Sequence, residues 1–228
     1  MTATPLAATA GALGVSPVGF ELSSAQKAAV LTVRNDGDTP MSVQVRVFRW
    51  TQKDGADQLA PTDAVVVSPP LASLDPHTDQ VVRLVRLAPS PTDAEESFRV
   101  IVDELPSAPP PGSAPVVTLL MRHSIPVFYE PAAPVNAALT WRIESSKDGL
   151  MLVAHNAGRR RERIADVTAY DADGHPLGGH KGLLGYVLPG GDASWPCPGA
   201  QAGKPDPRRL TASTDLGPLD VRLQPASP

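Results

Sequence analysis

Apolar and polar residues alternate in short segments along the first half of this chain. Within residues 41–50 (MSVQVRVFRW), Val43 and Val45 fall on one face and the residues between them on the other, which is the two-residue period of a β-strand. Further strand-like segments, separated by turn-forming sequences, are residues 29–34, 65–67, 79–87, 97–105 and 116–129. About seven strands in so short a stretch are typical of an immunoglobulin-like sandwich.

A second set of strand-like segments follows a short proline-rich sequence. Its members are residues 137–143, 150–154, 164–170, 182–188, 193–195 and 211–215. The sequence EPAAP before them predicts a stiff linker, because proline fixes φ and lacks an amide donor. The predicted fold is all-β, with two tandem immunoglobulin-like β-sandwich domains: residues 15–129, a linker at 130–134, and residues 135–228. Residues 1–14 are expected to be either a flexible N-terminus or the remnant of a leader, since they lack a basic start and an apolar run.

Composition narrows the class of protein. The 228 residues include 26 prolines, which argues against a helical bundle, because a proline inside a helix costs about 3 kcal/mol. The net charge of −4 argues against nucleic-acid binding. A single cysteine excludes an intrachain disulfide and a cysteine-based zinc site.

Motifs that would indicate an enzyme or a metal site are weak. The sequence has no G-x-S-x-G, H-E-x-x-H or G-x-x-x-x-G-K-[ST] motif. Asp171, Asp173 and Gly174 resemble the start of a calcium loop but lack the later ligands, so an ordinary turn is predicted. His175 and His180, which follow that turn, are expected to be solvated. We therefore expect no enzymatic activity, no cofactor and no metal.

Two polar features have plain structural interpretations. The basic run of residues 159–163 (RRRER) predicts a solvated turn, with contact to an anionic partner as the alternative. Cys197 lies between Pro196 and Pro198, which predicts an accessible loop thiol without function.

Residues 116–129 (VVTLLMRHSIPVFY) are unusual, because both faces of this predicted strand are partly apolar. Val117, Leu119 and Met121 form the second apolar row. One interpretation is a central sandwich strand. The other is an edge strand whose row binds a partner by strand addition, since proteins normally suppress exposed apolar edges.

Several segments together resemble the periplasmic pilus-assembly chaperones of the chaperone–usher pathway. They are VSPVGFELS (15–23), TVRNDGDTP (32–40), VQVRVFRWTQKDG (43–55), VSPPLASLDPHTDQVVRL (67–84), FRVIVDELP (98–106) and SIPVFYEPAAP (124–134). LVAHNAG (152–158) and YVLPGGDASW (186–195) add weaker support. RVFRWTQ and SIPVF are most similar to the archaic branch of the family, which includes chaperones of spore-coat-U-type pili.

The resemblance implies two immunoglobulin-like domains around a cleft, in a periplasmic protein that needs no cofactor. Such chaperones bind a fimbrial subunit by donor-strand complementation and deliver it to an outer-membrane usher, without nucleic acid or membrane insertion. By alignment, Val117, Leu119 and Met121 are the inserted row. Self-association through the same strand is left open.

Two departures from the family concern charged residues. The family usually anchors the carboxylate of the subunit with a basic pair, but Gly19 and Pro126 stand at those positions here. Nearby substitutes for the anchor are Arg122, Arg86 and Lys27.

Arg83 and Glu104 match positions of an interdomain ion pair in the family, although Glu130 stands where a basic partner is common. Two alternative functions remain: a PapD-like adhesion or scaffold protein without strand donation, and a carbohydrate-active β-sandwich. The second is disfavoured because Asp103 and Glu104 are adjacent, so they point to opposite faces of a strand.

Overall fold

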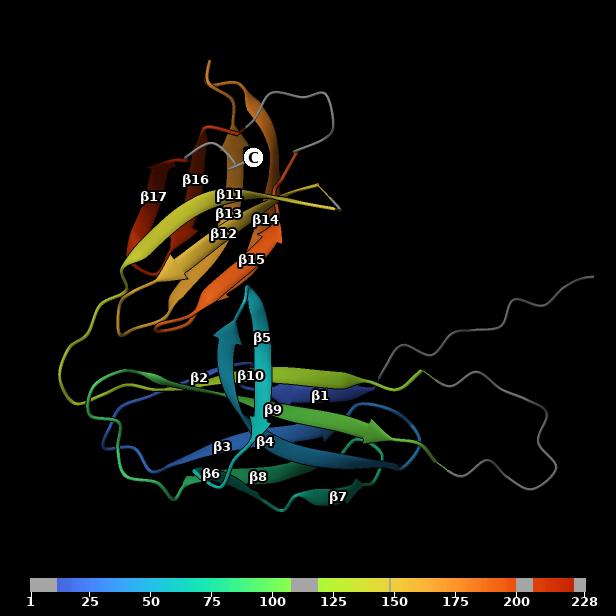
Figure 1. The fold of residues 1–228 in the computed structure, drawn as a ribbon. Coiled ribbons are helices and arrows are strands. Elements are labelled where there is room, and N and C mark those ends of the chain that lie inside the picture. Colours follow the sequence, from blue (N-terminus) through green and yellow to red (C-terminus); the bar gives the residue numbers. More distant parts are fainter. Residues whose placement is uncertain (1–11, 108–118, 148, 200–206, 224–228) are drawn as a thin grey trace, which may run out of the picture. The chain divides into compact units, whose positions relative to one another are not determined.

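The computed structural model describes residues 12–107, 119–147, 149–199 and 207–223, and over these residues the chain is all-β. This confirms the predicted fold class (Figure 1). In the same residues, no helix is long and apolar enough to cross a membrane.

The N-terminal strands form two sheets. The first has the order β1-β3-β8-β6, from β1 (Leu13–Ser16), β3 (Ala28–Asn35), β8 (Asp79–Arg86) and β6 (Val65–Ser68). The second has the order β2-β10-β9-β4-β5, from β2 (Phe20–Leu22), β10 (Arg122–Tyr129), β9 (Glu96–Leu105), β4 (Met41–Lys53) and β5 (Ala56–Pro61); β7 (Leu71–Leu74) also pairs with β4. Several of these strands are short, which is why the period-2 pattern alone found fewer.

The alternation of side chains along these strands determines which residues face the core. Leu31 of β3 pairs with Val82 of β8, and Val45 of β4 pairs with Val102 of β9. All four side chains are buried, as the alternation in residues 41–50 predicts.

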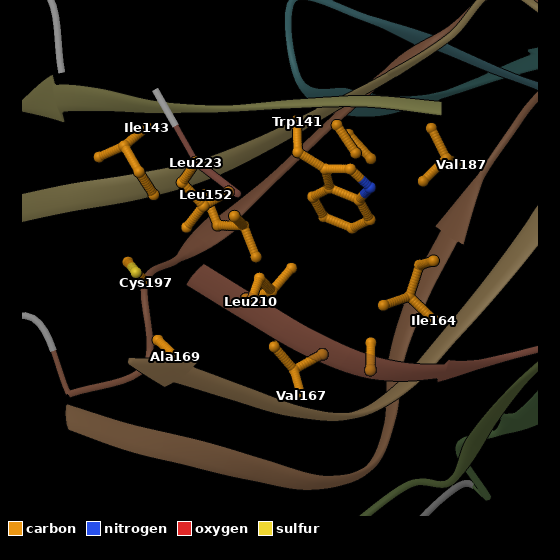
Figure 2. Close-up of a cluster of buried hydrophobic side chains, with 13 residues drawn as sticks. Trp141, Ile143, Leu152, Ile164, Val167, Ala169, Val187, Cys197, Leu210 and Leu223 are labelled. Atoms are coloured by element: carbon orange, nitrogen blue, oxygen red, sulfur yellow. The ribbon is translucent and has the colours of Figure 1, made fainter. Parts of the chain in front are cut away.

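The C-terminal strands form two more sheets. One has the order β11-β12-β15, from β11 (Leu139–Ser146), β12 (Gly149–Asn156) and β15 (Asp192–Pro196). The other has the order β14-β13-β16-β17, from β14 (Pro176–Val187), β13 (Glu162–Tyr170), β16 (Arg209–Thr214) and β17 (Gly217–Arg222). Their buried side chains form one cluster, in which Trp141, Leu152 and Leu210 are central (Figure 2).

A buried asparagine closes a turn in each half of the chain. The Asn35 Nδ2 group donates to the carbonyls of Thr39 and Leu74, at 2.9 and 3.2 Å, and its Oδ1 accepts from Gly37 N. Asn156 does the same in the second half: its Nδ2 donates to Arg160 O at 2.7 Å and its Oδ1 accepts from Gly158 N at 2.9 Å. Both side chains are therefore fixed as donors and acceptors.

Contacts divide the chain into two compact units. The first comprises Met1–Arg49, Ala60–Ser90 and Phe98–Phe128; the second comprises Trp50–Leu59, Pro91–Ser97 and Tyr129–Pro228. The second unit therefore includes two segments from the N-terminal half of the chain. The linker at residues 130–134 stays a prediction.

Two sequence-based predictions are wrong. Cys197 is buried in the cluster of the second unit, because its backbone N–H donates to Leu150 O at 2.9 Å and extends the pairing of β15 with β12, which puts its side chain on the same face as Ala193 and Trp195. Burial raises the pKa of this thiol to about 11. Arg161, in the basic run, is also buried, since its guanidinium pairs with the carboxylate of Glu95.

Candidate functional site

The segment with the second apolar row leads into β10, which lies between β2 and β9 in its sheet. The three-residue β2 covers only part of β10. Gly19, just before β2, lies against Pro126: a Cβ on Gly19 would be 3.6 Å from the Cγ of Pro126. The start of β10 is closer to β1, since the His123 ring nitrogen Nε2 lies 2.9 Å from Leu13 O. Strands β1 and β2 thus both lie near β10.

Residues 119–121 precede β10 and expose apolar side chains. Leu119 is 76% exposed and Leu120 is 43% exposed, whereas Met121 is partly buried. Val117, the first residue of the predicted row, lies outside the described residues. Leu119 is thus accessible to solvent. Residues 119–121 belong to no strand, so within the described residues the predicted strand 116–129 begins only at Arg122.

Met121 is held by two hydrogen bonds to one residue of β9. The backbone N–H of Glu104 donates to Met121 O at 2.9 Å. In return, the backbone N–H of Met121 donates to the side-chain Oε2 of Glu104 at 3.1 Å. A carboxylate takes the place of a main-chain carbonyl in this pair.

The next residue, Arg122, belongs to a charged group that crosses three strands. Its Nε donates to Asp103 Oδ1, and Nη2 of Arg46 in β4 donates to Asp103 Oδ2 at 2.6 Å. Burial raises the pKa of Asp103, but the hydrogen bonds from the two arginines outweigh this effect and leave the pKa below its usual range. Asp103 is therefore a carboxylate with one cation on each oxygen.

The three predicted substitutes for the carboxylate anchor have different surroundings. Arg122 is bound to Asp103, although its side chain remains 65% exposed. Arg86 is buried, and its Nε donates to Pro89 O at 3.0 Å. Lys27 is exposed, and its backbone carbonyl accepts from Arg86 N. Of these three, Arg122 is the one placed beside the apolar row.

Sequence reasoning missed Arg99. This residue of β9 donates from Nη1 to Ser124 O at 3.5 Å, two residues before Pro126. It is four residues from Asp103, so the two-residue period of the strand puts both side chains on the same face. That period was the signal that could have identified it.

The ion pair predicted from Arg83 and Glu104 is absent from the described residues. Arg83 lies exposed in β8, opposite Ser68 of β6, whereas Glu104 lies in β9 of the other sheet. Glu130 instead forms an ion pair with Arg160, whose Nη2 lies 3.4 Å from Glu130 Oε1.

Two other places have the geometry to hold a ligand. Oxygen and nitrogen atoms of Asp171, Asp173 and His175 lie within 4.8 Å of one another, but the backbone N–H groups of the latter two already donate to Asp171 Oδ1. A cavity of about 200 Å³ is lined by Ala137, Leu139, Glu162, Thr214, Leu216, Gly217, Pro218 and Leu219. Neither has a feature that selects a particular ligand.

The chain matches a known family over more than half of its length. Residues 12–134 match the pili and flagellar-assembly chaperone, PapD N-terminal domain. Similar proteins are the probable fimbrial chaperone LpfB of Escherichia coli O157:H7, 29% identical over 125 residues, and the chaperone protein PmfD of Proteus mirabilis (strain HI4320), 27% identical over 143 residues. These alignments cover 54% and 59% of this chain and 51% and 53% of the relatives, so the chain spans about half the length of the curated relatives it matches.

Solved structures of low sequence identity share the fold. One is the CsuC–CsuE chaperone–tip adhesion subunit pre-assembly complex from archaic chaperone-usher Csu pili of Acinetobacter baumannii, with a TM-score of 0.71, 22% identity, and coverage of 93% of this chain and 99% of that chain. Another is the Salmonella enterica SafA pilin in complex with the SafB chaperone, with a TM-score of 0.64, 23% identity, and coverage of 95% and 99%.

The fold and the family match agree with the resemblance noted in the sequence. The match extends from the first described residue, through β10, to the end of the predicted linker. The chain belongs to the family of pili and flagellar-assembly chaperones that is defined by the PapD N-terminal domain.

Proposed function

We propose that this chain is a periplasmic chaperone that captures a fimbrial subunit by strand addition and passes it to an outer-membrane usher. The observation that carries the proposal is the exposed apolar pair before β10, in which Leu119 is 76% and Leu120 is 43% exposed. Family membership supports the same function. In this mode, main-chain hydrogen bonds supply affinity and alternate side chains fill pockets of the subunit.

The row supplies enough free energy to matter for capture. Transfer of a side chain the size of leucine or methionine from water into an apolar pocket contributes roughly 1.5–3 kcal/mol. Val117, Leu119 and Met121 together would contribute on the order of 5–8 kcal/mol, before the costs of association are subtracted. Micromolar affinity corresponds to about 8 kcal/mol, so the row is a substantial part of what capture needs.

We propose Arg99 as the anchor for the subunit's C-terminal carboxylate, with Arg122 as the second cation. The positions that carry a basic pair in the resembling family, Gly19 and Pro126, are neighbours here and carry no charge. Arg99 reaches Ser124 O, close to that pair of positions, from the neighbouring strand. A charge-assisted hydrogen bond of this kind contributes about 1.5–3 kcal/mol.

The test is co-expression with a fimbrial subunit in a bacterial periplasm, followed by affinity purification of the chaperone. We expect Leu119→Asp to abolish recovery of the subunit while leaving the chaperone folded, because it would place an unpaired charge in the subunit core. Val45→Asp is the contrasting variant, since Val45 is 1% exposed and its replacement should unfold the first unit.

Circular dichroism and thermal melting separate the two effects. If Leu119→Asp melts at the wild-type temperature but still recovers the subunit, strand donation by this row is wrong. An adhesion or scaffold protein without strand donation would give that result. If Leu119→Asp unfolds as Val45→Asp does, the row belongs to the core of the chain itself.

A further inference from the structure

The residues that end β9 make contacts that strand pairing alone does not require. In an antiparallel pair, backbone N–H groups donate to backbone carbonyls of the facing strand. Here the Met121 N–H donates instead to the side chain of Glu104, while the Glu104 N–H still donates to Met121 O. The backbone N–H and the carbonyl of Met121 are therefore both hydrogen-bonded to Glu104 of β9.

The neighbouring acid ties the following residue. Asp103 is 8% exposed and accepts from Arg122, at the start of β10, and from Arg46, in β4 on its other side. Two adjacent carboxylates, on opposite faces of β9, therefore bind two adjacent residues of the incoming segment. Leu119 and Leu120 precede this point, and both are exposed.

We propose that Asp103 and Glu104 are positioning residues that hold Met121 and Arg122, and with them the exposed Leu119 and Leu120, beside β9 before a partner binds. The proposal rests on the proposed function, and it names the residues that keep the subunit-binding segment ordered. Binding is stronger when a segment is already ordered, because the cost of ordering it is not subtracted from the affinity. Asp103 and Glu104 would keep the segment ordered, and neither side chain would need to contact the partner.

The first measurement is amide hydrogen exchange on the free chaperone, by NMR. We expect Glu104→Ala to speed exchange of the Met121 amide about tenfold, because its acceptor is removed. Glu104→Gln should restore most of the protection, since the amide oxygen of glutamine can accept the same N–H. Asp103→Asn should speed exchange of the Arg122 Nε–H, which donates to Asp103 Oδ1, while leaving the core amides of β9 unchanged.

Matched controls remove a carboxylate elsewhere. Asp79→Asn removes a carboxylate that accepts from Arg34 at 2.8 Å in the other sheet of the first unit. Glu144→Ala removes one that accepts from Arg142 at 2.6 Å in the second unit. Neither should change exchange at Met121.

The second measurement is the rate at which the fimbrial subunit of the co-expression test is captured. We expect Glu104→Ala to slow capture about fivefold, Glu104→Gln to recover it, and both control variants to match the wild type. Unchanged exchange at Met121 in Glu104→Ala would overturn the proposal, as would faster exchange with an unchanged capture rate. If exchange responds as expected but the wild-type chain captures no subunit, the holding role stands and the proposed function fails.

Discussion

Breaking the buried ion pair between Glu95 and Arg161 should destabilise the second unit more than most substitutions of charged residues. The side chains are 0% and 1% exposed. The Glu95 carboxylate accepts from the guanidinium of Arg161 and from its backbone N–H, and the Glu95 N–H donates to Arg159 O at 2.9 Å. These bonds attach residues 91–97 to the turn before β13, within the second unit.

The change to make is Arg161→Met, which keeps an unbranched apolar chain and leaves the carboxylate without its cation. Loss of one partner of a buried pair typically costs 3–5 kcal/mol. Glu95 can reduce that cost by binding a proton, because burial already raises its pKa, and the effects that oppose burial come mainly from the charge and hydrogen bonds of Arg161, with a smaller one from the charge of Arg160. We therefore expect a loss of about 3 kcal/mol at pH 8.

The same pKa gives the sign of the pH dependence. A carboxyl group whose pKa is raised in the folded state stabilises that state below the unfolded pKa, and this stability is lost as pH rises through the folded pKa. Arg161→Met removes the charge that holds the Glu95 pKa down, so its folded pKa rises further. The variant should lose less stability at pH 5 than at pH 8.

The assay is urea unfolding followed by tryptophan fluorescence. All three tryptophans, Trp50, Trp141 and Trp195, belong to the second unit, so the signal reports on that unit. The double variant with Glu95→Gln should recover about 2 kcal/mol of the loss, since no buried charge remains. A loss below about 1 kcal/mol in Arg161→Met, or the same loss at both pH values, would refute the reasoning.

Three further predictions concern single residues. Arg99→Ala should weaken capture about 10- to 100-fold for a subunit with a free C-terminal carboxylate and little for one whose C-terminus is extended, as binding assays on both forms would reveal. Thiol reagents at pH 8 should label Cys197 only as fast as the second unit unfolds, and Cys197→Ser should lower the free energy of unfolding by about 1–3 kcal/mol; labelling at the rate of a free thiol would contradict its burial. Gly158→Ala should lower the melting temperature by several degrees, because a Cβ there would lie 2.4 Å from Asn136 O; an unchanged melting curve would mean that this turn relaxes freely.

The period-2 pattern predicted the core face of β4, because that face depends on neighbours within one strand; the donor row of Val117, Leu119 and Met121 stays a prediction. Arg161 and Cys197 were assigned wrongly from local composition. A basic run suggests a solvated turn, and only the fold brings Glu95, 66 residues earlier, to Arg161. Cys197 follows β15 two residues after Trp195, so it continues the core face of that strand, and its hydrogen bond to β12 extends the strand pairing.

The partners of the charged residues at the site could not be predicted from local sequence either. The adjacency of Asp103 and Glu104 predicted that their side chains lie on opposite faces of a strand. Their partners, Arg46, Arg122 and Met121, depend on which strands are neighbours in the sheet. Strand order is set by long-range packing, so the sequence alone did not predict which residues contact Met121 and Arg122.

The two buried asparagines have a consequence for the chemical ageing of the protein. Asparagine deamidates when the backbone nitrogen of the following residue attacks the side-chain carbonyl carbon and closes a ring. Here the following N–H groups are already engaged: Asp36 N donates to Ala12 O at 2.7 Å, and Ala157 N donates to Ala138 O at 3.0 Å. Folding should therefore slow conversion of both asparagines to aspartate, and incubation of unfolded chain should damage the very turns on which refolding of each unit depends.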